Sequence, residues 1–350
     1  MFKKRAKHLL EAISADAILI SSPENQQYFS GFTGGEAVLV LQKDKLTLFT
    51  DFRYFVQVKE EAPDYTLLDI TKTKPTAYLQ DFSPETIAFE EDFVSAKAAK
   101  LMADALPDSR WLGIDSEIMT QRSIKDETEL ACIRQAATLA DDAFHHILPL
   151  LRPGTCERDL ALELEWFMRK QGATGASFPI ICASGYRSAM PHGVASDKLL
   201  ENGDFVTLDF GCFYNGYASD MTRTIVLGKA DAEQKKIYET VLSAQMAALD
   251  CLHAGITGKE ADSVARNIIK KAGYGDAFGH SLGHGVGLQI HEQPNLSPRS
   301  ETVLRPGAVV SVEPGIYIEG FGGVRIEDLV IITENGHENM THSEKKLLEL

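Results

Sequence analysis

The sequence predicts two domains, a small α/β domain and a larger α+β domain that contains a pseudo-twofold repeat. The chain has 350 residues, which is more than one average domain holds. Short apolar segments alternate with helical patterns up to about residue 120, as they do in α/β proteins. Beyond that point the order helix, helix, hairpin occurs twice. We therefore place the domains at residues 1–120 and 121–350.

The first domain is expected to alternate strands and helices. Its apolar runs are short enough for strands, and the patterns between them have a helical period. The predicted strands are 17–21, 37–41, 46–50 and 87–89, and the predicted helices are 3–14, 52–61 and 95–106. The segment RSIKDETEL then opens the second domain. There Asp126 as N-cap and Glu129 three residues later form a capping-box pattern, which predicts the start of a helix.

The second domain repeats one set of elements. A helix beginning at Asp126 and a second helix ending at Gly172 lead into an apolar hairpin, and from Asp231 the same order returns. The register of the two copies agrees. Gly203 lies six residues before Asp209, and Gly307 lies six residues before Glu313. A second acid follows in each copy, namely Asp220 and Glu327. Two similar halves with acids at equivalent places predict a pseudo-twofold domain with these acids at its centre.

The first hairpin brings two of the acids to one face. Asn215-Gly216 is a strong signal for a two-residue turn. Such a turn pairs Asp209 with Thr222 and Gly211 with Asp220. Because alternate residues of a strand share a face, Asp209 and Asp220 become diagonal neighbours, with Cα atoms roughly 7–8 Å apart.

The second hairpin has a similar arrangement. A turn centred on Gly320 places Glu313 opposite Glu327, and Arg325 shares the face of Glu327. The other nearby cation, Arg223, falls on the face away from Asp220. Four carboxylates meeting in a core repel one another, and divalent cations would remove that conflict.

A glycine-rich segment supplies imidazoles. FGHSLGHGVGLQIHEQP contains His280, His284 and His291, and its glycines argue against an α-helix there. Glycines also allow the backbone to lie close to a ligand. Four carboxylates with one imidazole form a hard, oxygen-rich ligand set, which favours a Mn²⁺, Co²⁺ or Zn²⁺ site over a thiolate-type site.

Composition excludes several classes of protein. The net charge of −15 argues against nucleic acid as a partner, because phosphate binding needs clustered Lys and Arg. The sequence contains no run of 18 or more apolar residues, so no membrane-spanning helix is expected. The five cysteines are scattered, with no CxxC, which predicts reduced thiols and a cytoplasmic protein.

Several motifs together resemble one family. DFGCFYNGYASDMTRT, GHSLGHGVGLQIHE, VEPGIY and GGVRIED closely resemble the pita-bread metallopeptidases, in the branch of Xaa-Pro aminopeptidases and prolidases. YFSGFTGGEAVLVL and TDFRYF resemble the ribonuclease-H-like N-terminal domain of creatinase and prolidase. Methionine aminopeptidases lack that domain, and creatinase lacks the metal ligands. The resemblance implies a pita-bread catalytic domain and a homodimer or larger homo-oligomer.

The resemblance also implies a site with two divalent cations, Mn²⁺ in the first place and Co²⁺ or Zn²⁺ otherwise. Asp209 and Glu327 would bridge the cations, and Asp220 would bind one of them through both oxygens. His284 and Glu313 would bind the other, with Glu313 also accepting a proton. Two further histidines, His192 and His291, would donate hydrogen bonds to the substrate. Residues around the ligands would be Arg325, Thr222 and His280.

The implied activity is hydrolysis of the Xaa-Pro bond at the N-terminus of peptides. A water molecule shared by two cations is a nucleophile near neutral pH. The alternative is a prolidase, which cleaves Xaa-Pro dipeptides, and a more remote one is a non-catalytic peptide-binding module. Asn295 follows the last histidine motif where some prolidases carry an arginine, and Arg299 lies further on. We therefore expect the aminopeptidase activity first.

Overall fold

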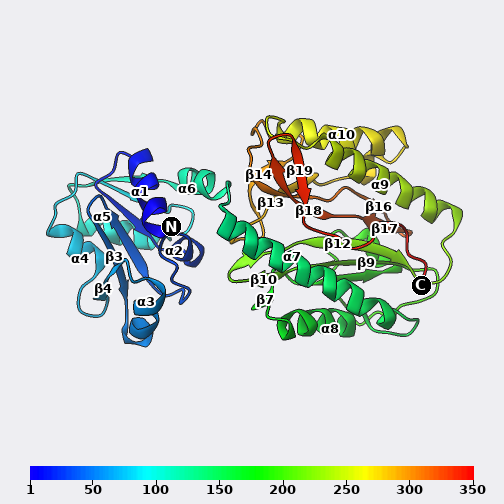
Figure 1. The fold of residues 1–350 in the computed structure, drawn as a ribbon, viewed down its shortest axis with the longest axis horizontal. Helices are drawn as coiled ribbons and strands as arrows, with labels where there is room; N and C mark the ends of the chain where they lie inside the picture. Colours follow the sequence, from blue (N-terminus) through cyan, green and yellow to red (C-terminus); the bar gives the residue numbers. More distant parts are fainter. The chain divides into compact units, whose positions relative to one another are not determined.

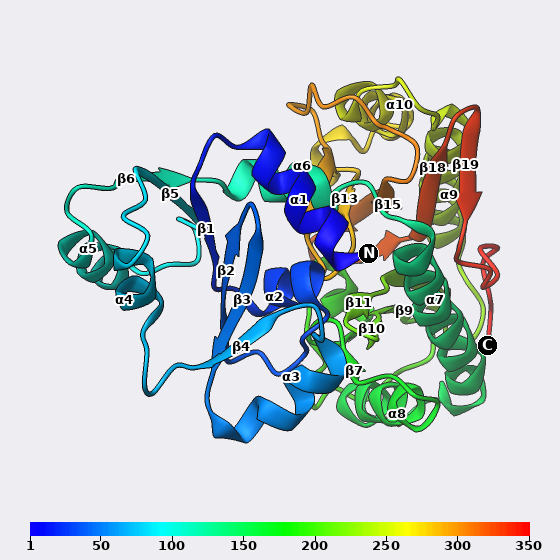
Figure 2. The same ribbon diagram turned by 60° about the vertical axis from the view of Figure 1, so that its left-hand side comes forward.

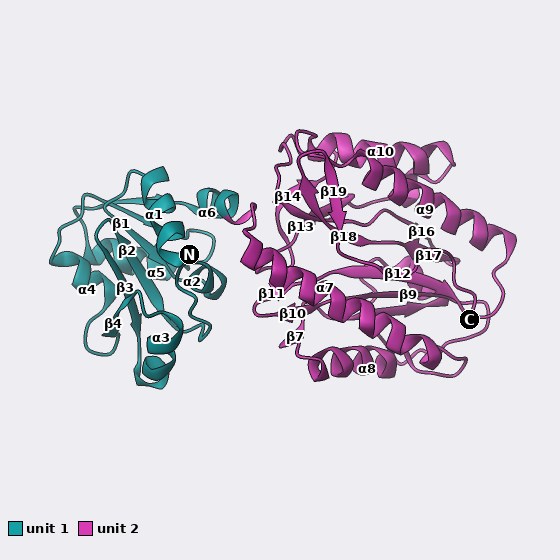
Figure 3. Cartoon of the chain, in the orientation of Figure 1, with its two compact units in different colours: residues 1–121 teal, residues 122–350 magenta.

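In the computed structural model, which describes residues 1–350, the chain forms two compact units, residues 1–121 and 122–350 (Figure 3). The first unit contains a six-stranded mixed sheet with the strand order β4-β3-β2-β1-β5-β6. Its strands are β1 (Ala17–Ile20), β2 (Val38–Gln42), β3 (Lys45–Thr50), β4 (Thr66–Asp69), β5 (Thr86–Phe89) and β6 (Arg110–Gly113). All four predicted strands are present.

Helices complete the first unit (Figure 2). They are α1 (Phe2–Ala12), α2 (Pro23–Ser30), α3 (Phe55–Glu61), α4 (Pro75–Gln80), α5 (Ala96–Ala105) and α6 (Asp115–Arg122), with a 3₁₀ turn η1 (Phe52–Tyr54) before α3. The predicted helix 52–61 is thus a 3₁₀ turn followed by a short α-helix. The sequence missed α2, α4, α6, β4 and β6. Each of these elements has only four to eight residues, too few for a hydrophobic period to stand out.

The second unit consists of two halves, residues 122–230 and 231–350 (Figure 1). The first half contains α7 (Glu127–Ile147), η2 (Leu148–Leu150), α8 (Glu157–Lys170), β7 (Gly175–Ala176), β8 (Ile181–Ser184), η3 (Gly185–Ala189), β9 (Phe205–Phe210), β10 (Cys212–Tyr214), β11 (Tyr217–Ala218) and β12 (Met221–Val226). The second half contains α9 (Ala232–Cys251), α10 (Gly258–Lys271), η4 (Gly275–Ala277), β13 (Gly283–Gly285), β14 (Glu292–Leu296), β15 (Val309–Val312), β16 (Gly315–Ile318), β17 (Gly322–Arg325), β18 (Asp328–Thr333) and β19 (Gly336–Asn339).

Each half packs a pair of helices against its own strands. In Figure 1, α7 and α8 lie below and in front of the strands of the second unit, and α9 and α10 lie above them. The first core joins residues of α7 and α8 to β9 and β12, and the second joins α9 and α10 to β15 and β18. The leading helix of each half begins with a capping box, at Asp126 and at Asp231. The predicted capping box at Asp126 and Glu129 is therefore confirmed.

The first hairpin has the predicted register. Asn215 and Gly216 both have positive φ, 49° and 84°, which a two-residue hairpin turn requires. Thr222 pairs with Asp209, as expected. The ladder is interrupted between β9–β12 and β10–β11, at Gly211 and Asp220. A Cβ atom at Gly211 would lie 1.9 Å from the carbonyl oxygen of Ser219, so only glycine allows this close approach.

The second hairpin repeats the design around Gly320, whose φ is 76°. Val312 pairs with Asp328, and Gly315 pairs with Arg325. Glu313 and Glu327 lie in the interruption between these two ladders. The glycines that precede the acids, Gly203 and Gly307, both have positive φ, 89° and 84°. The turns differ in length, with two residues in the first hairpin and three in the second, but the equivalent interruptions and glycines support the predicted pseudo-twofold repeat.

Candidate metal centre

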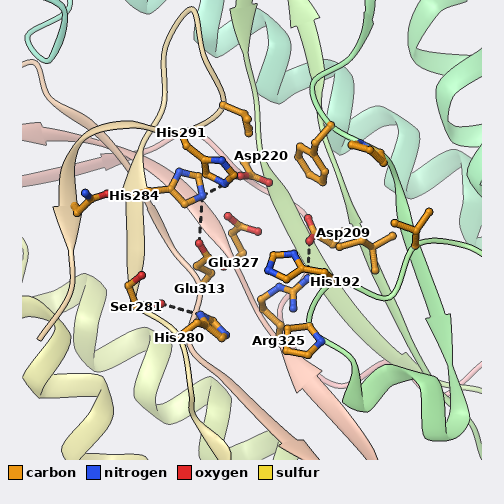
Figure 4. Close-up of a pocket in the computed structure, with 17 residues that line it drawn as sticks. His192, Asp209, Asp220, His280, Ser281, His284, His291, Glu313, Arg325 and Glu327 are labelled. Carbon is orange, nitrogen blue, oxygen red and sulfur yellow. Dashed lines mark hydrogen bonds and ion pairs between the residues drawn. The ribbon is translucent and has the colours of Figure 1, made fainter. Parts of the chain in front are cut away.

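A cavity of about 570 Å³ opens where the two hairpins of the second unit meet (Figure 4). Its walls bring together residues from both halves that are far apart in the sequence. They include all five predicted ligands and the three predicted non-ligand histidines, namely Asp209, Asp220, His284, Glu313, Glu327, His192, His280 and His291. The structure therefore gathers the predicted residues around one space.

Asp209 and Glu327 are each bound by a residue of the opposite half. Arg325 donates from Nη2 to Asp209 Oδ2 at 2.5 Å. Thr222 donates from Oγ1 to Glu327 Oε2 at 2.6 Å and accepts from Arg325 Nε at 3.0 Å. Thr222 thus binds Glu327 rather than Asp209, which it faces in the ladder.

The second oxygen of each of these two acids has no partner. Asp209 Oδ1 and Glu327 Oε1 are buried and make no hydrogen bond. An unpaired buried carboxylate oxygen is costly, and a bound cation is the partner that suits it. The two orphaned oxygens therefore favour a metal site between the hairpins.

His284 lies between the other two acids. Its Nε2 is 3.5 Å from Asp220 Oδ2 and 3.3 Å from Glu313 Oε1. Its Nδ1 donates to the carbonyl oxygen of Gly285 at 3.1 Å, which leaves Nε2 free as a ligand atom. Ligand atoms of Asp220, His284 and Glu327 all lie within 4.8 Å of one another, close enough for a single ion.

Electrostatics make the unliganded site unfavourable. Burial raises the pKa of Asp220 well above its usual value, and the charges of Glu327 and Asp209 raise it further. Burial also raises the pKa of Glu327 well above its usual value, reinforced by Glu313 and Asp209. Burial raises the pKa of Glu313 to about 7. Acids that resist ionisation this strongly fit a site in which divalent cations compensate the charge.

The remaining predicted residues surround this centre. His280 donates from Nδ1 to the carbonyl oxygen of Ser281 at 2.8 Å, and its Nε2 lies 2.9 Å from the Tyr317 hydroxyl. That hydroxyl accepts from Arg325 Nη1 at 2.7 Å. A chain of contacts therefore runs from His280 through Tyr317 and Arg325 to Asp209. Sequence reasoning missed Tyr317, although it ends the VEPGIY motif.

The two other histidines face the cavity without belonging to the acid cluster. The ring of His291 packs edge-on against His284, with centroids 4.4 Å apart. His192 lies in an exposed turn, and Figure 4 shows its ring on the side of the cavity where Asp209 and Arg325 lie. Phe178 and Asn295 also line the cavity, but Arg299 does not.

Arg223 occupies the reverse side of the hairpins, as predicted. Its Nη1 donates to the carbonyl oxygens of Thr222 and Glu327, and its Nη2 donates to Asp328 Oδ1 at 2.8 Å. It therefore joins β12, which follows Asp220, to Glu327 and the start of β18. Sequence reasoning did not find this contact, because Arg223 and Asp328 are 105 positions apart.

Fold and site define a class of protein, the metal-dependent hydrolases with a carboxylate-rich centre. Comparison with known families identifies the member of that class. Residues 131–334 match metallopeptidase family M24, and residues 3–124 match the creatinase/prolidase N-terminal domain. The chain belongs to metallopeptidase family M24 and is an enzyme of that family. Its metal centre takes divalent ions.

Known proteins resemble the chain over its whole length. The Xaa-Pro dipeptidase of Pyrococcus furiosus is 42% identical, with 99% of this chain and 100% of the relative covered. An Xaa-Pro dipeptidase structure from Bacillus anthracis has a TM-score of 0.97 at 43% identity and 100% coverage of both chains. The X-Pro aminopeptidase structure from Thermotoga maritima has a TM-score of 0.92 at 40% identity, covering 98% and 100%. The predicted pita-bread fold with a creatinase-type N-terminal domain is confirmed.

None of the helices combines the length and apolar character needed to cross a lipid bilayer.

Proposed function

We propose that this metallopeptidase hydrolyses Xaa-Pro dipeptides. The observation that supports the chemistry is the pair of orphaned carboxylate oxygens, Asp209 Oδ1 and Glu327 Oε1, beside an imidazole with a free Nε2. The substrate class is supported by the dipeptidase relatives at 42–43% identity. The aminopeptidase activity that the sequence led us to expect first is less well supported than this alternative.

Five residues would hold two divalent cations. They are Asp209, Asp220, His284, Glu313 and Glu327, all of which line the cavity. When bound, such cations supply Lewis-acid polarisation of the substrate carbonyl and lower the pKa of water in the site. Arg325 and Thr222 would orient the carboxylates of Asp209 and Glu327, because each binds one oxygen and leaves the other without a protein partner.

The chain's own groups move protons and stabilise charge. Glu313 accepts a proton from the attacking water and returns it to the prolyl nitrogen as the bond breaks. His192 and His291 donate hydrogen bonds to the carbonyl oxygen as it becomes negative. Burial lowers the pKa of His291, which favours the neutral ring, and a neutral imidazole donates one N–H.

Selectivity for proline comes from the apolar part of the cavity. Phe178, Pro191, Val194 and Ile290 lie along its walls. A proline ring has no N–H to satisfy and a fixed φ, so an apolar pocket of defined shape suits it. We propose that these side chains contact the ring.

One observation favours aminopeptidase activity as a second candidate. Arg325 is the only Lys or Arg that lines the cavity, and Asp209, Tyr317 and Thr222 already bind it. A dipeptide brings a C-terminal carboxylate that needs a partner in the site, whereas a longer peptide does not. In addition, the X-Pro aminopeptidase from Thermotoga maritima is 40% identical to this chain.

Two substrates separate these candidates. The purified enzyme with Mn²⁺ is assayed on the dipeptide Ala-Pro and on a tripeptide Ala-Pro-Xaa of equal concentration. We expect cleavage of the dipeptide and little or none of the tripeptide. Efficient cleavage of the tripeptide assigns aminopeptidase activity instead. No cleavage of either substrate, with bound metal measured in the sample, refutes the proposal.

We further propose Mn²⁺ as the native metal and a homodimer as the active form. Mn²⁺ accepts the oxygen-rich ligand set of four carboxylates and one imidazole. Elemental analysis of protein purified without added metal tests the first proposal, and light scattering tests the second. A proline-containing dipeptide released by other peptidases would reach such an enzyme in the cytoplasm.

A further inference from the structure

Glu157 is a fully buried carboxylate at the start of α8 that takes no part in the proposed mechanism. Its exposed fraction is 0%, and it does not line the metal centre. Five donors converge on it. Glu157 Oε1 accepts from the backbone N and the Oγ of Ser184, and Oε2 accepts from the backbone N and the Oγ of Ser196. Arg187 donates from Nε to Oε2 at 3.0 Å. Such a dense set of bonds is more than a helix start requires.

These donors all belong to one loop, residues 184–196, which carries His192. Ser184 stands at the beginning of the loop and Ser196 at its end, so a single carboxylate closes the loop. Arg187 connects Glu157 to the middle of the loop, because its Nη2 also donates to the carbonyl oxygen of Val194 at 2.7 Å. The loop therefore depends on Glu157 at both ends and, through Arg187, within two residues of His192.

The start of α8 adds backbone bonds to the same loop. The N–H groups of Glu157 and Arg158 donate to the carbonyl oxygens of Lys198 and Ser196, both at 3.0 Å. His192 itself is exposed and rests on a turn in which Gly193 donates to Met190 and Val194 donates to His192. An exposed side chain on a turn gains little order from packing, so its position depends on how firmly the loop is held.

We propose that Glu157 is a positioning residue that fixes the loop 184–196 and thereby holds His192 over the reacting bond. The inference rests on the proposed function, in which His192 hydrogen-bonds the substrate carbonyl. Glu157 touches neither substrate nor metal. Its effect is transmitted by the hydrogen bonds to Ser184, Arg187 and Ser196.

The test is Glu157→Gln, which keeps the shape but replaces one acceptor oxygen by an NH₂ group that faces donors. We expect kcat/KM for Ala-Pro to fall about 10- to 100-fold, mainly in kcat, because a small misplacement of a group that acts on the transition state is that costly. Metal content is expected to stay at the wild-type value. In a His192→Ala background, Glu157→Gln should cause no further loss.

Glu90→Gln is the matched control. Glu90 is also buried, at 1% exposure, and its carboxylate accepts from the backbone of Ser21 and Ser22, from Ser22 Oγ and from Asn25 Nδ2. It lies in the first unit, whereas the 184–196 loop belongs to the second. Its substitution should lower the melting temperature and leave kcat/KM of the folded enzyme unchanged.

The outcomes distinguish the inference from the proposed function. An equal loss from Glu157→Gln with and without His192, loss of metal, or wild-type activity would each overturn the positioning role. If wild-type enzyme cleaves no Xaa-Pro substrate, the proposed function fails, and the imidazole NMR signal of His192 then decides the inference alone. We expect Glu157→Gln to shift and broaden that signal, while Glu90→Gln leaves it unchanged; an unmoved signal refutes the inference. Should Glu157→Gln not fold, Ser196→Ala replaces it with the same readouts and a smaller expected loss.

Discussion

The two halves of the second unit deliver their acids differently. Asp209 belongs to a paired strand, opposite Thr222, whereas Glu313 and Glu327 both lie where the ladder of the second hairpin is interrupted. Asp220, the second acid of the first half, lies in the interruption of its own hairpin, so Asp209 is the acid with a ladder partner. The two halves therefore need not hold their acids in the same backbone setting to line one cavity.

The halves also exchange partners. Arg325 of the second half binds Asp209 of the first, and Thr222 of the first half binds Glu327 of the second. In contrast, the cluster receives its imidazole from one side only, because His284 has no counterpart that contacts the acids from the first half. The protein frame is symmetric, and the ligand set is not.

The largest effect is expected from removing one acid of either half. Asp220→Ala and Glu327→Ala should both abolish metal binding and activity, since each leaves the other carboxylates without a complete ligand set. Elemental analysis and the Ala-Pro assay measure this. If one of these two variants keeps its metal and activity while the other variant loses both, only one half forms the metal site.

The next largest effect on metal affinity or activity is expected from removing a hydrogen bond between the two halves. Thr222→Val removes the hydrogen bond to Glu327 and should lower metal affinity or activity about 10- to 100-fold, the usual cost of losing a residue that orients a ligand. Titration with Mn²⁺ measures it. Thr207→Val is the control, because Thr207 bonds Thr224 in the same hairpin and no acid. Equal losses in both variants would contradict the exchange of partners.

A smaller effect concerns the glutamate beside His291 in the second half. Burial would raise the pKa of Glu292, but the charges of Lys125 and Arg122 outweigh burial and hold it below the ordinary 4.5. The folded state therefore favours the ionised form. Its contribution to the free energy of unfolding is complete above pH 4.5 and is lost as the pH falls through the lower folded pKa.

Urea denaturation between pH 7 and pH 3 tests this dependence on Glu292. Glu292→Gln should be less stable than wild type at pH 7, and the difference between the two proteins should shrink as the pH falls. A difference that stays constant with pH would exclude Glu292 as the titrating group.

The smallest effect is expected at the turns. Gly320 has a φ of 76° and no atom within 4 Å of an added Cβ, so Gly320→Ala costs only backbone strain, about 1 kcal/mol. Gly320→Asn should recover part of this loss, because asparagine tolerates the left-handed region, as Asn215 does in the first hairpin at φ 49°. Thermal denaturation measures both. A loss several times larger would indicate that the second turn contacts something that the first does not.

The sequence predicted what depends on local patterns. The turn at Asn215-Gly216 fixed the pairing of Asp209 with Thr222, and the turn at Gly320 fixed the place of Glu313 opposite Glu327, because hairpin register follows from the turn. Contacts between distant segments were out of reach. Arg223 with Asp328 and Glu157 with Ser196 join positions 105 and 39 residues apart, and no periodicity connects them.

The single imidazole has a consequence for how such a site can be encoded. A symmetric assembly of two identical half-chains places every residue at its centre twice, so it would bring two copies of His284 or none. In a continuous chain the two halves have separate sequences, so a histidine can be present in one half and absent from the other. The asymmetric set of candidate ligands therefore depends on both halves of the repeat lying within a single polypeptide.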